Sequence, residues 1–144
     1  MDETNAGRRV GILPMFTQAQ VRFVLALVGA YFVGQGIYMA LAPGSFFEYV
    51  GPFGPQNDHY IRDNASFSVA LGLGCLVGLV RPRWQVPALA IVTAQFWLHA
   101  LSHLVDIGEA DPEYYGPVEF AMLVVGAVVL TGTLVLAGRL RGEE

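Results

Sequence analysis

The run VPALAIVTAQFWLHALSHLVDI occupies residues 86–107 and combines a membrane-length apolar stretch with a line of polar side chains. A helix rises about 1.5 Å per residue, so about 20 apolar residues cross the hydrocarbon core of a bilayer. Side chains three or four positions apart share one face of a helix. That spacing is followed by Gln95, His99, His103 and Asp106. The run therefore predicts a transmembrane helix with one polar stripe on an otherwise apolar surface.

Three further stretches are apolar and long enough to cross a membrane. The first ends at Pro43-Gly44 and the second ends before Arg81-Pro82, and both pairs contain a proline that stops a helix. The apolar runs are continuous and do not alternate, which favours helices over barrel strands. The four predicted spans are residues 20–42, 60–80, 86–107 and 115–137. We therefore predict an all-α integral membrane four-helix bundle in up-down order over residues 17–138, with tails at residues 1–16 and 139–144.

The composition agrees with a membrane protein. Of the 144 residues, 54% are hydrophobic and only 14% are charged, whereas about 25% are charged in soluble domains. The single cysteine, Cys75, excludes an internal disulfide and any multi-cysteine metal motif. The basic residues follow the ends of the spans, which argues against nucleic-acid binding. The expected surroundings are a lipid bilayer, together with a membrane-protein partner or further copies of the chain.

The arginines predict the orientation of the bundle, and the chain contains no lysine. One side of the four-span topology carries every basic residue except Arg62: Arg8, Arg9, Arg22, Arg81, Arg83, Arg139 and Arg141. The other side carries the acids Glu48, Asp58, Asp63, Asp106, Glu109, Asp111, Glu113 and Glu119. Because basic loops stay in the cytoplasm, we predict that both termini are cytoplasmic.

The outer third of the predicted bundle collects polar side chains from three spans. The second span begins there, the third ends there with the polar stripe, and the fourth begins there. The predicted cluster consists of Asp58, His59, Arg62, Asp63, Gln95, His99, His103, Asp106 and Glu119. Polar groups in hydrocarbon are costly, so this cluster is the main functional candidate of the sequence. The residues that would carry any catalysis stay unassigned.

Two interpretations of the cluster involve no metal. In the first it is a structural network, in which Arg62 pairs with a nearby carboxylate and the histidines form hydrogen bonds across helices. In the second it handles protons or a small molecule, and His99 and Gln95 line a polar pocket that is reached from outside.

A third interpretation is a metal site. Imidazoles at positions i and i+4 with a carboxylate are a common ligand set for Zn or Fe, and a third histidine would complete it. The predicted ligands are His59, His99, His103 and Asp106.

Small side chains recur every four residues along the second span, at Ser66, Ala70, Gly74 and Gly78. Helices in lipid associate by close packing, and small residues let their backbones approach. We therefore predict that this ridge packs against another helix or a partner. Between the first two spans, the aromatic residues from Phe46 to Val50 predict a short amphipathic piece in the membrane interface.

Two motifs resemble a group of small bacterial four-span membrane proteins. Their pattern is (D/E)-H-x-x-R-D at the start of the second helix and H-x-x-x-H near the end of the third. The matching positions are Asp58, His59, Arg62, Asp63, His99 and His103, while Asn64-Ala65 stands where the pattern has glycine. The chain is more distantly similar to the DoxX-like and DUF4345-type families. The resemblance covers about residues 20–135 and implies the four-span fold and the bacterial inner membrane, but no reaction.

These observations favour a non-catalytic structural or accessory subunit of the membrane, with the outer polar cluster as a clamp between helices. The alternative is a metal-binding or redox membrane enzyme that uses the four predicted metal ligands, with Glu119 as a further ligand or proton acceptor.

Overall fold

The structure, a computed structural model, describes the backbone of residues 4–142 and the side chains of residues 18–142. Its elements are α1 (Thr4–Leu41), α2 (Pro43–Tyr49), α3 (Asp58–Val80), the 3-10 helix η1 (Pro82–Trp84), α4 (Gln85–Val105) and α5 (Tyr115–Gly142). The part of the chain described contains four helices long and apolar enough to cross a membrane, and no strand. The predicted all-α membrane bundle is therefore confirmed. The side chains of the predicted tail, residues 1–16, lie outside the described residues.

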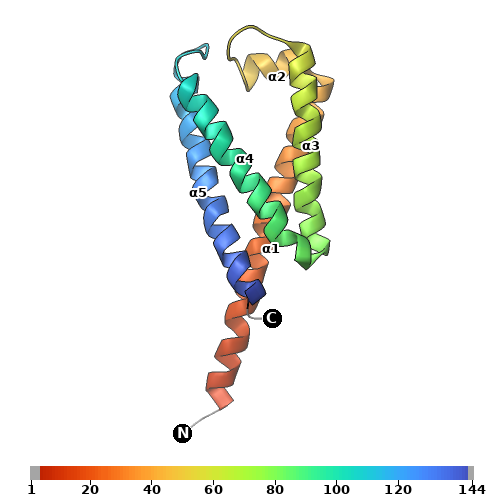
Figure 1. Cartoon of the computed structure of the whole chain (residues 1–144), viewed down its shortest axis with the longest axis vertical. Coiled ribbons are helices and arrows are strands. Elements are labelled where there is room, and N and C mark those ends of the chain that lie inside the picture. Colours follow the sequence, from red (N-terminus) through yellow and green to blue (C-terminus); the bar gives the residue numbers. More distant parts are fainter. Residues whose placement is uncertain (1–3, 143–144) are drawn as a thin grey trace.

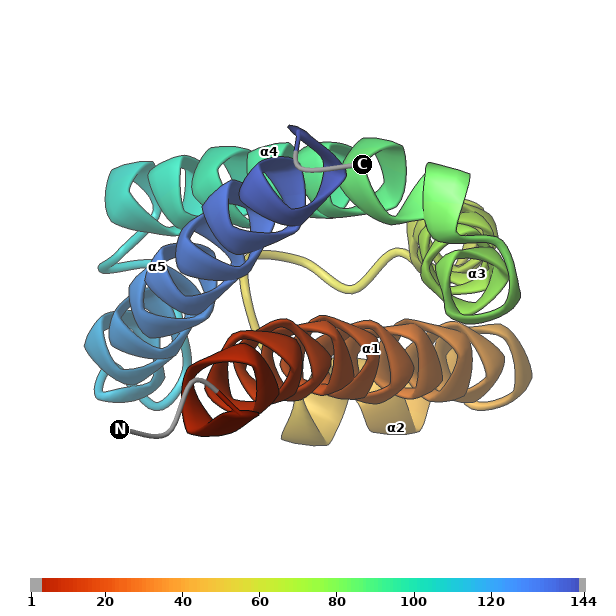
Figure 2. The same cartoon turned by 90° about the horizontal axis from the view of Figure 1, so that it is seen from below.

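The four long helices form two pairs, α1 with α3 and α4 with α5, and consecutive long helices run in opposite directions (Figure 1). The pairs converge at the end that carries η1 and the C-terminus, which we call the terminal end. They separate toward the end that carries α2 and the turn between α4 and α5, which we call the loop end. Seen along the bundle, the loop that joins α2 to α3 crosses the space between the two pairs (Figure 2).

Local sequence explains where the helices begin and end. Pro43 has no N–H and disfavours a helical residue before it, so Ala42 leaves the helical conformation, with φ −139° and ψ 60°, and α1 gives way to α2. The side-chain oxygen of Asn57 accepts hydrogen bonds from the N–H groups of His59 and Tyr60, at 3.1 and 3.3 Å, and so caps α3. These two boundaries set the start of α3 at the loop end.

Glycines on facing sides of α1 and α3 bring these two helices close together. A Cβ atom on Gly72 would lie 2.8 Å from the carbonyl oxygen of Gly29 and 2.8 Å from the backbone nitrogen of Val33. One on Gly36 would lie 2.8 Å from the carbonyl oxygen of Ala65. Because the obstacles are backbone atoms, only glycine fits at Gly36 and Gly72.

The predicted ridge of small residues is not the face that makes this contact. Ser66 and Ala70 are exposed, and a Cβ on Gly74 would meet no atom within 4 Å. Of its members, Gly78 does face α1, since a Cβ there would lie 3.2 Å from Leu25. The rotation of α3 about its axis turns most of the ridge away from α1, so the packing of its other members against a further helix or a partner stays a prediction.

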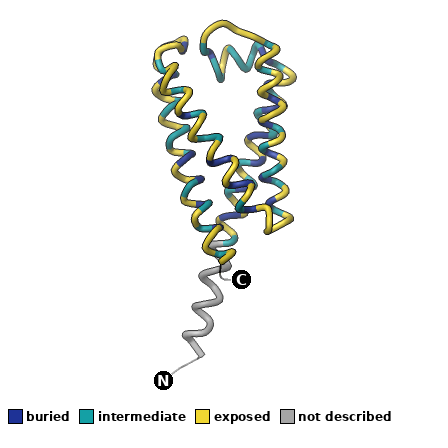
Figure 3. Tube along the Cα trace, in the orientation of Figure 1, coloured by how far each residue is buried: buried dark blue, intermediate teal, exposed yellow. Residues whose placement is uncertain are grey.

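The buried core lies mainly where the two pairs converge. It contains Val21, Leu25, Phe32, Cys75, Ala88, Leu89, Val92, Leu130 and Ala137. Elsewhere most of each helix surface is exposed or half-buried (Figure 3), and the exposed side chains include large apolar ones on every long helix. An apolar surface of this extent fits lipid and not water, so the chain is described below as a multi-pass membrane protein.

Candidate functional site

A row of three polar side chains joins α4 to α5 near the loop end. The Nε2 atoms of His99 and His103 lie 3.0 Å apart, which is hydrogen-bond distance. The other ring nitrogen of His103, Nδ1, faces Oε2 of Glu119 at 3.6 Å. The side chains of His103 and Glu119 are only 13% and 17% exposed. We call His99, His103 and Glu119 the His–Glu row.

The row follows from helical spacing and from the turn between α4 and α5. His99 and His103 are one helical turn apart, so their rings share a face of α4. The chain reverses between Asp106 and Tyr115, which brings the first turns of α5 beside the last turns of α4. Gly116 permits this reversal, because a Cβ there would clash with the carbonyl oxygen of Ile107.

The loop between α2 and α3 covers the His–Glu row. Phe53 pairs with Ala110 in an isolated antiparallel bridge, and the N–H of Asp111 donates to the carbonyl oxygen of Pro52 at 3.1 Å. These contacts hold the ring of Phe53 edge-on against His103, with the ring centroids 4.7 Å apart. We call this contact the Phe53 clasp. It links the α1–α3 pair to the α4–α5 pair at the loop end.

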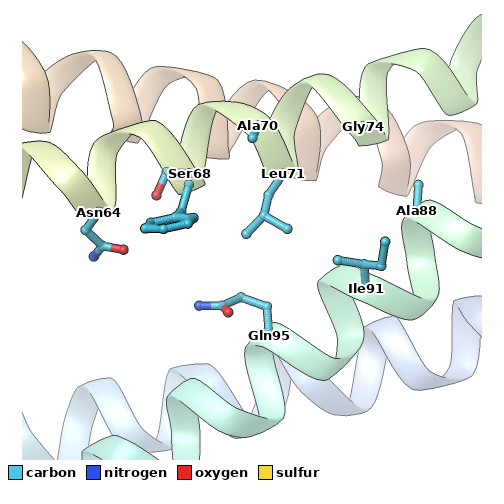
Figure 4. Close-up of a pocket in the computed structure, with 9 residues that line it drawn as sticks. Asn64, Ser68, Ala70, Leu71, Gly74, Ala88, Ile91 and Gln95 are labelled. Atoms are coloured by element: carbon cyan, nitrogen blue, oxygen red, sulfur yellow. The ribbon is translucent and has the colours of Figure 1, made fainter.

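A cavity of about 430 Å³ lies between α3 and α4. Its apolar wall includes Phe67, Leu71 and Ile91, and its polar groups are the side chains of Asn64, Ser68 and Gln95; Ala70, Gly74 and Ala88 complete the lining. Figure 4 shows Gln95 reaching from α4 into the space faced by Asn64 and Ser68 on α3. Phe67 is 67% exposed and Ile91 is 60% exposed, so the cavity opens at the bundle surface.

The predicted polar cluster divides between two places. The His–Glu row lies between α4 and α5, and Gln95 lines the cavity. The residues at the start of α3 lie apart from both. Nε2 of His59 contacts Asp63 at 3.4 Å on its own helix, and the two side chains are 80% and 57% exposed. The polar side chains at the start of α3 therefore lie at the surface and contact one another along that helix.

Asp106 ends α4 as its C-cap residue and is exposed. Its N–H donates to the carbonyl oxygen of Ser102, and its carbonyl oxygen accepts from the N–H of Glu109. These are backbone contacts that shape the turn.

The four predicted metal ligands, His59, His99, His103 and Asp106, are not brought together. Among the residues whose side chains are described, no three His, Cys, Asp or Glu lie close enough to share a metal ion. The physical reason is that the two helix pairs separate toward the loop end (Figure 1), where His59 lies at the exposed start of α3 and His99 and His103 lie near the end of α4.

Arg62 supplies a direct check of this arrangement. Its guanidinium lies 3.9 Å from Asp58, and the two side chains are 53% and 45% exposed. Exposed pairs of this kind contribute little to stability. We expect Arg62→Leu to change the free energy of unfolding by less than about 0.5 kcal/mol, measured by SDS titration of the protein in detergent micelles. A loss of several kcal/mol would show instead that Arg62 has a buried carboxylate partner.

Sequence reasoning missed three contributors to these sites: Phe53, Asn64 and Ser68. The signal for Phe53 was an aromatic residue inside the turn-forming sequence Gly51-Pro-Phe-Gly-Pro55, between two spans. Asn64 and Ser68 are four residues apart on α3 and share its cavity face, as a polar i, i+4 pair in an apolar span indicates.

The comparisons with known proteins identify the family and no activity. Neither a curated protein nor a solved structure matches the chain. One family model matches residues 20–108, which run from α1 through α4 and include the cavity, His99 and His103, but not Glu119. That model is the domain of unknown function DUF4345, and because it covers more than half of the chain, the protein belongs to the DUF4345 family.

Proposed function

We propose that this protein is a non-catalytic accessory protein of the membrane that binds a small amphipathic molecule in the α3–α4 cavity. The observation that carries the proposal is the cavity itself, with about 430 Å³ of space, a mainly apolar wall and three polar side chains. Small-molecule sites have this character, with volumes of about 300–1,000 Å³ and a few polar groups that orient the ligand.

The polar groups of the cavity determine what kind of molecule fits. Asn64, Ser68 and Gln95 lie within membrane-spanning helices, where an amide or hydroxyl without a partner is costly. A plain acyl chain would fill the apolar part and leave these groups unpaired. An occupant with a polar head and an apolar body satisfies both parts of the wall. Entry from the bilayer is direct, because Phe67 and Ile91 are exposed at the cavity opening.

We further propose that the loop end faces the outside of a bacterial inner membrane. The terminal end carries four arginines: Arg81 between α3 and η1, Arg83 in η1, and Arg139 and Arg141 in the last turn of α5. Cytoplasmic ends of membrane helices are enriched in arginine. In this orientation the His–Glu row lies in the outer half of the membrane. A role as a subunit of a larger assembly, or as a homo-oligomer, is compatible with the apolar outer surface of the bundle.

The alternative proposal of a metal-dependent or redox enzyme needs its predicted ligands to converge. His59 lies at the surface against Asp63 and not with the His–Glu row. This arrangement favours the binding function over the metal site.

A leucine at Gly74 tests the binding function. Gly74 lines the cavity, and a Cβ there has no atom within 4 Å, so a larger side chain can begin at this position and extend into the cavity. The leucine would take up space that the occupant needs, and a steric cost of about 1.4 kcal/mol or more to binding corresponds to retention about tenfold lower or worse. The measurement is solvent extraction of the purified protein from lipid nanodiscs, followed by mass spectrometry of the small molecules released.

The matched control is Gly34→Leu on α1. Gly34 is exposed, and a Cβ there likewise has no atom within 4 Å, but it does not line the cavity. We expect Gly34→Leu to retain the same molecule as the unmodified chain. Equal small-molecule content in all three proteins would contradict the proposal.

A further inference from the structure

The polar and apolar residues of the α3–α4 cavity are separated along its length (Figure 4). Nearer the loop end lie its three polar groups, the side chains of Asn64, Ser68 and Gln95. Apart from Phe67, the apolar residues lie nearer the terminal end: Ala70, Leu71, Gly74, Ala88 and Ile91. This order follows from the opposite directions of the two helices, because α3 begins at the loop end and α4 ends there. An amphipathic occupant therefore matches the wall with its head toward the loop end.

The polar groups of the cavity lie deep in the bundle. Gln95 is at the middle of α4, which runs from Gln85 to Val105. Asn64 and Ser68 lie on the order of 9 and 15 Å from the start of α3, at a rise of about 1.5 Å per residue. The hydrocarbon core of a bilayer is only about 30 Å thick. A head that reaches Ser68 and Gln95 is therefore surrounded by protein and hydrocarbon and not by water.

The wall of the cavity offers no charge to balance a charged head. None of the described residues that line it is charged. The charged side chains of α3 all precede Asn64 and contact one another at the surface, His59 with Asp63 and Arg62 with Asp58. An ion held away from water without a counter-charge is costly. Amides and hydroxyls, in contrast, both donate and accept hydrogen bonds, so they suit a neutral polar head.

The His–Glu row does not supply the missing charge either. Its three side chains face one another between α4 and α5, and none of them lines the cavity. Figure 4 shows instead the carboxamides of Asn64 and Gln95 directed into the same space, one from each helix. The head of an occupant would thus lie between two uncharged amides.

We propose, on the basis of the binding function above, that the occupant is an uncharged single-chain amphipath that lies with its head toward the loop end. The head both donates and accepts hydrogen bonds, as a hydroxyl or a carboxamide does. A single chain suits the volume of about 430 Å³, which is near the lower end of the range for small-molecule sites. Fatty-acid anions, alkylammonium ions and phospholipids are excluded by the charge that they bring to this depth.

Two pairs of probes test the charge of the head. Dodecanamide is neutral, whereas dodecanoate has the same chain and a head of nearly the same shape but is an anion at about pH 9. The second pair is 1-dodecanol and dodecylammonium, which is a cation at about pH 7. Affinity is expressed as the mole fraction of probe in a lipid nanodisc at half-saturation, so that partition into the bilayer is counted. We expect the neutral member of each pair to bind at least tenfold more tightly.

The side-chain amide of Asn64 reports binding in the NMR spectrum of the full-length protein, labelled with ¹⁵N-asparagine and held in nanodiscs. The chain has only three asparagines, so assignment needs few variants. Asn57 is the internal reference, because its side chain caps α3 and does not line the cavity. We expect the neutral probes to shift the Asn64 signal and to leave that of Asn57 unchanged.

Two further measurements test the orientation. Dodecanamide with a nitroxide on its last carbon should broaden the backbone signal of Gly74 more than the side-chain signal of Asn64, and the reverse order would overturn the proposal. Gln95→Leu removes a polar group from the membrane, so the bundle should still fold. It should bind dodecanamide about tenfold less tightly, the effect of one net hydrogen bond. An unchanged affinity would show that the head does not reach Gln95.

The outcomes separate this inference from the function on which it rests. If charged and neutral probes bind equally and Gly74→Leu abolishes the binding of both, the cavity is a ligand site and the uncharged head is overturned. If no probe shifts the Asn64 signal more in the unmodified chain than in Gly74→Leu, the cavity proposal is overturned as well. The control Gly34→Leu should bind the neutral probes as the unmodified protein does.

Discussion

Gly72→Leu is expected to push α1 and α3 apart and to destabilise the native bundle. A Cβ at this position already lies 2.8 Å from two backbone atoms of α1, which cannot move aside as a flexible side chain would. The larger side chain can be accommodated only by moving one helix away from the other. We expect a loss of about 3 kcal/mol or more in the free energy of unfolding. SDS titration followed by circular dichroism measures the loss.

Gly74→Leu is the matched control for this prediction, two residues further along the same helix. The substitution adds the same side chain at a position where a Cβ meets no atom within 4 Å. The control should therefore fold like the unmodified chain. If both variants unfold to the same extent, glycine content and not the α1–α3 contact would determine stability.

His103→Ala is expected to have the second-largest effect, because one ring contacts three different segments. Its removal takes the partner from Glu119, whose side chain is only 17% exposed, and ends the contacts with His99 and Phe53. A buried polar group that loses its partner costs about 1–3 kcal/mol, and more if it is charged. We expect a loss of about 2 kcal/mol in the free energy of unfolding.

The fluorescence of Trp97 can follow the unfolding of this variant, because its indole N–H donates to Thr131 on α5 at 3.1 Å and so reports the separation of α4 from α5. His59→Ala is the control, since the side chain of His59 is 80% exposed and contacts Asp63 and Tyr60 of its own helix. It should change stability by less than about 0.5 kcal/mol. Equal losses for the two histidine variants would contradict the assignment of the His–Glu row.

The helices could be predicted from the sequence, because length, continuous apolarity and the prolines at 43 and 82 are local properties. The contact between His99 and His103 could also be predicted, since a separation of four residues places two side chains together on any helix. Glu119 could be placed near them from the short connection between α4 and α5 alone.

The position of His59 could not be predicted in the same way. Whether a side chain at the start of α3 meets the α4–α5 pair depends on the rotation of that helix and on how far the two helix pairs separate at the loop end (Figure 1). An apolar helix with small residues on more than one face does not specify its own rotation. Here the close contacts of Gly36 and Gly72 determine the rotation, and they turn the Ala70–Gly74 face toward the cavity. The Phe53 clasp could not be predicted either, because it depends on the position of the loop between α2 and α3 relative to α4.

The clasp has a mechanical consequence for the cavity. The covalent link between α3 and α4 runs through η1 at one end of the molecule, whereas the Phe53–Ala110 bridge joins the two helix pairs without a covalent bond at the other. The two helix pairs are thus joined covalently at the terminal end and by the Phe53 clasp at the loop end. A bulky occupant that widens the space between α3 and α4 must strain the same backbone contacts that press Phe53 onto His103. A larger occupant would push the two helix pairs apart, whereas the Phe53 clasp holds them together at the loop end.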